Sequence, residues 1–231
     1  MDSIVLDGRT FFFEIHPKSI RSLNLKITSS HTFDVTCPRF TPAFVIKKFI
    51  LDNQSWILRH AIKVQSKPSL LNLTEIPLLG IPYKLIYSQT AHDSVIISDD
   101  DHLIRVNTTA FSESHVKKIL SLRLKKLAAP YINKELKSLS LKFGFHYARV
   151  TLRNQRSRFG SCSTRKNLNF NWQIILFPEN VFRHVLLHEL THLEHMNHSV
   201  RFWSSLASYD PDWKSNNRWL KTQGNKHLIF S

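Results

Sequence analysis

The sequence predicts an α+β fold, in which a β-rich N-terminal region is followed by a small sheet with a helix packed on it. Three observations support this class. Runs of alternating apolar and polar residues occupy most of the chain before residue 108. Apolar residues then recur every three or four positions between residues 116 and 143. Two more strand-like runs precede a histidine-rich segment with helical periodicity.

The N-terminal region, residues 1–105, is expected to combine short strands with one helix. Alternation typical of half-buried strands occurs in "TFFFEIH", "SLNLKIT" and "TFDVT", and again in "IPLLGIPYKLIYSQ" and "SVIISDDDHLIRVN". Between these groups, "TPAFVIKKFILDNQSWILRHAIKVQ" spaces its apolar residues as a single helix does. We place the domain boundary at residue 105, close to where the strand pattern gives way to a helical one.

The second domain, residues 106–231, is expected to open with a long helix. Ser112 is a suitable N-cap and Gly144 a suitable stop. Pro130 lies between them and is expected either to kink this helix or to divide it into two. Two strand-like runs, "YARVTLRNQ" and "LNFNWQIIL", then flank "RSRFGSCSTRKN", whose small residues suit a turn or a close backbone approach.

Composition limits the class of protein. The 231 residues are 42% hydrophobic, enough for a buried core, and we expect a cytoplasmic protein because no apolar run has the length of a signal peptide or membrane span. The only cysteines, Cys37 and Cys162, are far apart, which argues against a disulfide framework and against a cysteine-rich zinc site. A net charge of +15 makes nucleic acid a candidate partner beside a merely solvated basic surface.

The most informative stretch is "HVLLHELTHLEHMNHSVRFW", residues 184–203. Pro178 can start a helix here, which places His188 and His192 one turn apart on one face. Two imidazoles at this spacing can bind one ion, and Glu189 between them can take a proton from water. The sequence therefore predicts a metal site rather than a chance HExxH match.

The third ligand is predicted from geometry. On a straight helix His184 lies about 12 Å from His192 along the axis, and His195 about 10 Å from His188, so neither closes a three-ligand site. His198 can do so, because Asn197 is a suitable helix-ending residue after which the chain can turn back. We therefore expect His188, His192 and His198 to bind the metal, with Ser199 capping the next helix.

Three protein ligands leave one position for water, which is the arrangement of a catalytic zinc ion. We expect one Zn²⁺ per chain, Glu189 as general base, and hydrolysis of an amide bond. A second electrophile is needed for the developing oxyanion. The candidates, left open by the sequence, are Arg158, His195, Arg201 and Tyr209.

These residues carry a resemblance to a known family. "RSRFGSCS", "LNFNWQIILFP" and "HVLLHELTHLEHMNHSVRFW" resemble the YgjP-like family of predicted zinc metallopeptidases, closely over residues 145–207 and more loosely elsewhere. The resemblance implies a minimal zincin-like core, with His188, His192 and His198 as zinc ligands and Glu189 as the catalytic residue. Phe159 replaces the usual tryptophan and Thr191 a common alanine. Metzincins share the histidine spacing, but here His195 replaces their glycine and no methionine follows the third ligand, so we reject that assignment.

The resemblance also implies a place for a peptide or protein substrate. Zincin-type peptidases lay an extended substrate along an edge strand beside the metal helix, where backbone hydrogen bonds tolerate many sequences. The candidate substrate-binding residues are Gly160, Ser161, Cys162, Asn169 and His195. The alternative is that Gly160, Ser161 and Cys162 only permit close packing. Cys162 is expected to be an inert thiol rather than a reversible zinc ligand.

Two other functions are weighed against this peptidase. The charge of +15 suits a SprT-like protease that acts on DNA-bound proteins, and stimulation of cleavage by DNA would favour it. A non-catalytic, zinc-stabilised nucleic-acid-binding module is the alternative from a different class. Glu189 argues against that module, because a structural zinc site needs no base.

Overall fold

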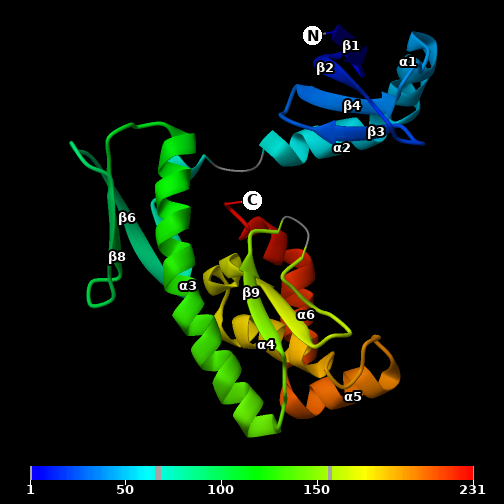
Figure 1. Ribbon diagram of the computed structural model, residues 1–231. Coiled ribbons are helices and arrows are strands. Elements are labelled where there is room, and N and C mark those ends of the chain that lie inside the picture. Colours follow the sequence, from blue (N-terminus) through cyan, green and yellow to red (C-terminus); the bar gives the residue numbers. More distant parts are fainter. Residues whose placement is uncertain (1, 66–68, 156–157, 231) are drawn as a thin grey trace. The chain divides into compact units, whose positions relative to one another are not determined.

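The computed structural model describes residues 2–65, 69–155 and 158–230, and the chain forms two compact units, Met1–Pro68 and Ser69–Ser231 (Figure 1). The division falls at Pro68 rather than at the predicted residue 105. The physical reason is that the sheet between residues 75 and 108 shares a hydrophobic core with the long helix after it. No described helix has both the length and the apolar character needed to cross a membrane.

The first unit is a four-stranded sheet covered by helices. Its strands are β1 (Asp2–Leu6), β2 (Arg9–Lys18), β3 (Asn24–Ile27) and β4 (Thr32–Pro38), in the order β1-β2-β4-β3 with β2 and β4 parallel. Alternate residues of β4 are buried, as the sequence pattern predicts for a sheet with one covered face. The core of this unit contains Leu6, Phe11, Phe33, Val35, Cys37, Ile46, Ile50, Ile57 and Ala61.

Two helices replace the single helix expected in this unit. Helix α1 (Ala43–Asp52) ends at Asn53, and α2 (Gln54–Gln65) begins directly after it. The Asn53 side chain donates a hydrogen bond of 2.8 Å to the carbonyl oxygen of Phe49. Asparagine side chains compete in this way with the backbone for the carbonyls of the preceding turn. Apolar spacing alone does not reveal such a break.

The second unit begins with a short 3₁₀ turn, η1 (Leu70–Asn72), and a sheet of β5 (Glu75–Leu78), β6 (Ile81–Gln89), β7 (Ser94–Ser98) and β8 (Leu103–Thr108). The strand order is β5-β6-β8-β7, with β6 and β8 parallel and the other pairs antiparallel. This is the topology of the first sheet. In both sheets the first hairpin turns through a glycine with positive φ, Gly8 or Gly80.

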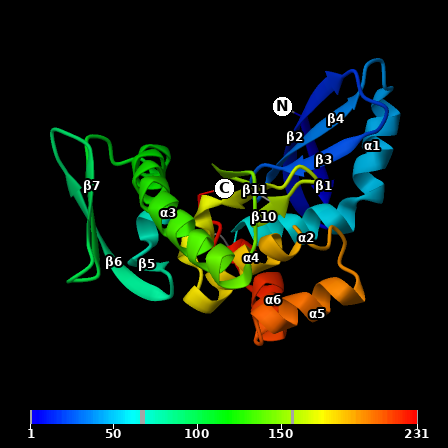
Figure 2. The same cartoon turned by 60° about the horizontal axis from the view of Figure 1, so that its bottom comes forward.

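Helix α3 (Glu113–Phe143) runs unbroken through Pro130, and it has the predicted Ser112 N-cap and a left-handed Gly144 at its end. Buried residues follow at every fourth position from Val116 to Leu136. Because four residues turn the helix by 40° more than a full turn, this buried stripe winds around the helix. α3 can therefore contact both the strands β7 and β8 and the helix α4. In Figure 2 it lies between β7 and α4.

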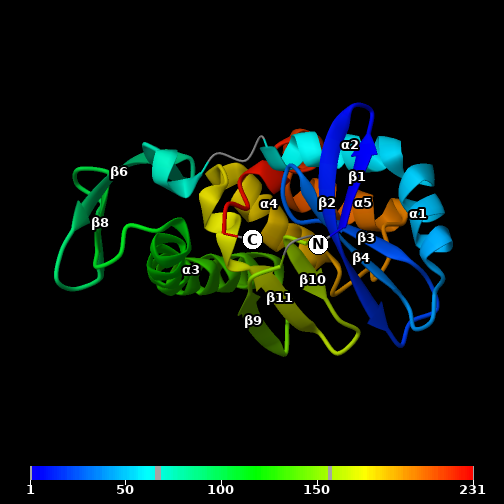
Figure 3. The ribbon, with the colours of Figure 1, turned by 90° about the horizontal axis from the view of Figure 1, so that it is seen from above.

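A three-stranded sheet follows, with β9 (Arg149–Arg153), β10 (Gly160–Cys162) and β11 (Asn167–Asn171) in the order β10-β11-β9. β9 and β11 are parallel neighbours, while β10 pairs with β11 and forms the edge beside α4 (Figure 3). The run "LNFNWQIIL" is only partly strand, because Trp172–Leu176 form a buried 3₁₀ turn, η2. Helices α4 (Glu179–Thr191), α5 (Val200–Tyr209) and α6 (Trp213–Thr222) and a last turn, η3 (Gly224–Lys226), complete the unit. The α+β class predicted from the sequence is confirmed.

Candidate metal centre and active site

Helix α4 carries the first two histidines and the glutamate of the motif. The chain enters it through extended Pro178, and Glu179 lies in the first turn, where a negative charge favours a helix. The face formed by Val181, Val185 and Leu186 is buried. This packing fixes the helix, and with it the positions of His188 and Glu189.

The turn after α4 brings His198 to the other two histidines. α4 ends at Thr191, earlier than the predicted stop at Asn197, and Asn197 does not adopt a left-handed conformation. Ser199 then caps α5 as expected, its hydroxyl accepting from the backbone N–H of Phe202. His198 Nε2 lies 3.0 Å from His188 Nε2, and one ring nitrogen from each of His188, His192 and His198 falls within a 4.8 Å cluster.

The three imidazoles are suited to bind a cation. Burial, together with the neighbouring histidines, lowers the pKa of His188 to about 3, and burial also lowers the pKa of His198. Both rings are therefore neutral near pH 7, as ligands must be. His192 Nδ1 donates 2.9 Å to the backbone carbonyl oxygen of His195, which leaves its Nε2 available.

The separation of the His188 and His198 nitrogens is close to that around a tetrahedral ion. Zinc–nitrogen bonds of about 2.0–2.1 Å at tetrahedral angles place two ligand nitrogens about 3.3 Å apart. The separation of 3.0 Å between His188 and His198 is close to this value. A donor set of three imidazoles is also one that zinc accepts at catalytic sites.

Glu189 is buried beside the histidines, with 6% of its surface exposed. Burial raises the pKa of its carboxyl group to about 8, and the positive charge of Arg158 partly offsets this shift. The side chain lies directly against Gly160 of β10. A Cβ atom at residue 160 would lie 2.6 Å from Glu189 Cγ and 2.7 Å from Oε1, so the side chain can occupy this place only beside glycine.

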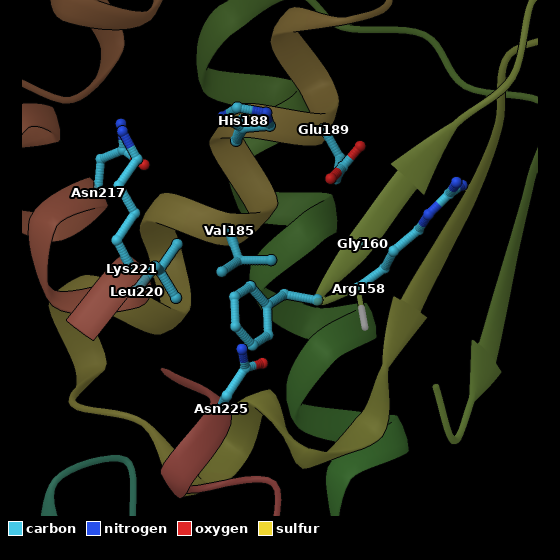
Figure 4. Close-up of a pocket in the computed structure, with 10 residues that line it drawn as sticks. Arg158, Gly160, Val185, His188, Glu189, Asn217, Leu220, Lys221 and Asn225 are labelled. Atoms are coloured by element: carbon cyan, nitrogen blue, oxygen red, sulfur yellow. The ribbon is translucent and has the colours of Figure 1, made fainter. Parts of the chain in front are cut away.

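A pocket of about 320 Å³ opens next to His188 and Glu189 (Figure 4). Residues of α6 form the wall opposite Gly160 and Arg158, and Val185 lies between the two sides. Among the described residues, its lining comprises Arg158, Phe159, Gly160, Val185, His188, Glu189, Asn217, Leu220, Lys221 and Asn225. This volume is within the range of sites that bind a ligand or a substrate side chain.

Four of the candidate substrate-binding residues lie on β10 and β11, and the fifth, His195, contacts α5. Gly160, Ser161 and Cys162 form edge strand β10, and Asn169 of β11 donates to Ser161 Oγ at 3.3 Å. The imidazole of His195 is hydrogen-bonded to Ser205 Oγ of α5 at 3.1 Å, so its side chain is engaged there. The contribution of His195 to the site is its backbone carbonyl.

Cys162 does not belong to the histidine cluster. Burial raises the pKa of its thiol to about 11, and the charge of Glu189 adds to this effect. Its Sγ donates a weak hydrogen bond to the carbonyl oxygen of Ser163. A thiol that stays protonated is a poor metal ligand, which favours the inert interpretation.

The candidates for the second electrophile differ in their position relative to the pocket. Arg158 lines the pocket beside Glu189. Tyr209 instead donates to both carboxylate oxygens of Glu194 at 3.1 Å and packs against Phe143. Arg201 lies exposed on α5 and is not among the described residues that line this pocket. Of the four candidates, Arg158 is the one that lines the pocket beside Glu189.

Two parts of the site escaped the sequence analysis. Buried His184 pairs with Asp210, whose Oδ2 lies 2.6 Å from Nδ1, and so ties α4 to the end of α5. Helix α6 was not anticipated, although Trp213, Trp219 and Leu220 have helical spacing. Such spacing could have indicated the helix, but it cannot show that Asn217 and Lys221 face the metal-site helix.

Comparisons with known proteins place the chain in a metallopeptidase family. The model of the YgjP-like metallopeptidase domain matches residues 21–223, which is well over half of the chain. Among solved structures, the zymogen of abylysin, a metallopeptidase of Pyrococcus abyssi, is 19% identical with a TM-score of 0.36, covering 40% of this chain and 95% of its own. The zymogen of jannalysin, from Methanocaldococcus jannaschii, is 22% identical with a TM-score of 0.31, covering 41% and 95%. The comparison with curated proteins gives no match.

Proposed function

The chain belongs to the YgjP-like metallopeptidase family, and from this premise we propose that it is a zinc-dependent peptidase with one zinc ion held by His188, His192 and His198. The observation that carries the proposal is the cluster of three imidazoles beside a buried carboxyl group. A purely structural zinc site would have no use for that carboxylate.

In this proposal Glu189 is the general base. Zinc, when bound, supplies a Lewis acid that makes water a better nucleophile at neutral pH and polarises the scissile carbonyl group. A Glu189 carboxylate oxygen takes the proton from the attacking water and passes it to the leaving amine nitrogen. Positive charge beside Glu189, such as that of Arg158, favours the ionised form that this role requires.

The substrate is proposed to bind as an extra strand beside β10. β10 pairs with β11 on one side only and contacts α4 in the same unit. An extended peptide can hydrogen-bond to the backbone groups of Gly160 and Cys162, which face away from β11, and such bonds recognise a peptide without requiring a particular sequence. Arg158, two residues before this strand, is proposed to stabilise the oxyanion.

The proposal is tested with zinc-loaded protein and a mixture of peptides, with cleavage followed by mass spectrometry. We expect Glu189→Gln to keep its zinc but to lose about 10²–10⁴-fold in rate, because it cannot move the proton. His188→Ala is expected to lose both zinc and activity. If Glu189→Gln cleaves as fast as the wild type, the proposed role of Glu189 is wrong.

A further inference from the structure

The pocket beside Glu189 extends away from the histidine cluster toward α6 (Figure 4). Its inner surface is apolar, since Phe159, Val185 and Leu220 line it. Phe159 is held in place on its other side, because its ring fits against Gly224, where a Cβ atom would lie 2.6 Å from the ring. This part of the pocket is therefore suited to the aliphatic portion of a side chain.

The outer part of the pocket is polar and positively charged. The amide of Asn217 and the exposed ammonium group of Lys221 lie there on α6, whereas Asn225 lies at the other end of the pocket (Figure 4). Amide N–H groups and an ammonium group all donate hydrogen bonds, and a carboxylate accepts them. The one carboxylate in the lining is Glu189, which is buried.

Two cations, Arg158 and Lys221, line the pocket among the described residues, and they differ in their partners. Arg158 acts on Glu189, whose pKa its charge lowers. Lys221 forms no ion pair with any residue in the described part of the chain. Lys221 is therefore the cation in this pocket that can pair with a group on the substrate.

We infer that this pocket is a substrate subsite for a glutamate side chain next to the scissile bond, with Lys221 as the residue that determines specificity. The inference rests on the proposed peptidase function. The methylenes of the substrate glutamate contact Val185 and Leu220, and its carboxylate accepts hydrogen bonds from Lys221 and from the amide of Asn217. A lysine at the same substrate position would meet a like charge.

The test uses peptides that differ only by Glu, Gln or Lys, placed in turn at each position around a cleaved bond and amidated at the C-terminus. Binding is measured by fluorescence anisotropy to the zinc-loaded Glu189→Gln protein, and cleavage is measured with the zinc-loaded wild type. We expect the Glu peptide to bind at least about fivefold more tightly than the Lys peptide at one position. Lys221→Glu is expected to reverse this order. Lys214→Glu makes the same charge change on α6 outside the pocket and is expected to keep it.

The outcomes separate the inference from the proposed function. Cleavage by the wild type without charge preference, or with a preference that Lys221→Glu leaves unchanged, overturns the subsite while the peptidase stands. Charge-dependent binding without cleavage supports the subsite and counts against the peptidase. A second peptide set with free C-termini identifies the source of the carboxylate. If charge preference appears only in that set, the pocket binds the C-terminal carboxylate of a peptide, and the proposed subsite for a glutamate side chain is wrong.

Discussion

Gly160 leaves room for Glu189, because a Cβ atom at this residue would lie 2.6 Å from Glu189 Cγ. We expect Gly160→Ala to displace the carboxylate while the three histidines keep their places. Since small misplacements of a catalytic group are costly, peptide cleavage should fall by about 10- to 100-fold with zinc content unchanged. Cleavage rate and elemental analysis on the same sample provide the measurement.

Gly144→Ala is the matched control for this change. Gly144 has a positive φ of 75° at the end of α3, but a Cβ atom there would meet no neighbour within 4 Å. This variant should lose about 1–2 kcal/mol of stability through backbone strain and retain its cleavage rate. If both glycine variants lose activity equally, strain rather than the position of Glu189 explains the loss.

Glu189 also makes the metal-free protein sensitive to pH. Burial raises its pKa from 4.5 to about 8, so between these values the folded state holds a proton that the unfolded state has released. The contribution of this group to stability is therefore greatest below pH 4.5 and is lost as the pH rises toward 8.

Replacing Glu189 by glutamine removes this dependence. We expect the metal-free Glu189→Gln protein to gain stability relative to the wild type between pH 5 and pH 8, as measured by thermal unfolding midpoints. Glu75→Gln, at an exposed glutamate of β5, is the control and should show no such trend. A difference between Glu189→Gln and the wild type that is constant with pH would contradict a buried, proton-holding Glu189.

At the scale of single elements, α3 tests how a proline is tolerated inside a helix. Pro130 is exposed and lies within a helix that continues to Phe143. Pro130→Ala supplies a backbone N–H able to donate to the carbonyl of Lys126, and it should stabilise the protein by about 1–3 kcal/mol in thermal or denaturant unfolding. A loss of stability would mean that the proline ring makes packing contacts of its own.

The sequence predicted elements best where local chemistry sets their ends. As expected, α3 and α5 begin after the N-caps Ser112 and Ser199, and α3 ends before Gly144, because caps satisfy backbone groups through nearby residues. The break at Asn53 and the early end of α4 at Thr191 depend on hydrogen bonds and packing that apolar spacing does not encode. His198, which was predicted because a straight helix cannot bring His195 back to His188, lies in one cluster with His188 and His192. Its role as a ligand stays a prediction.

At the scale of the whole molecule, the boundary predicted at residue 105 differs from the structure because the second sheet packs on α3. Its residues Ile104 and Val106 belong to the same core as Leu120 of α3, so sheet and helix form one unit. A pattern of alternating residues shows that a strand has a buried face, but it does not show which element covers that face. Alternation also does not show the order in which strands pair, so the shared topology of the two sheets could not be predicted from it.

The separate cores predict that the second unit holds the metal by itself. His188, His192, His198 and Glu189 all lie within Ser69–Ser231, whose core is distinct from that of the first unit. A fragment of residues 69–231 should therefore fold and bind the same amount of zinc as the full chain, as measured by circular dichroism and elemental analysis. A folded fragment that binds no zinc would show that the first unit completes the site.

The central claim is the three-histidine site, and bound zinc in the wild type, His198→Ala and His195→Ala proteins tests it most directly. The account predicts about one zinc ion per chain in the wild type and in His195→Ala, because residue 195 contributes its backbone carbonyl, which alanine retains. His198→Ala should lose the ion. Zinc retained by His198→Ala but lost by His195→Ala would contradict the ligand assignment, and a wild type that cannot be loaded with zinc would contradict the site itself.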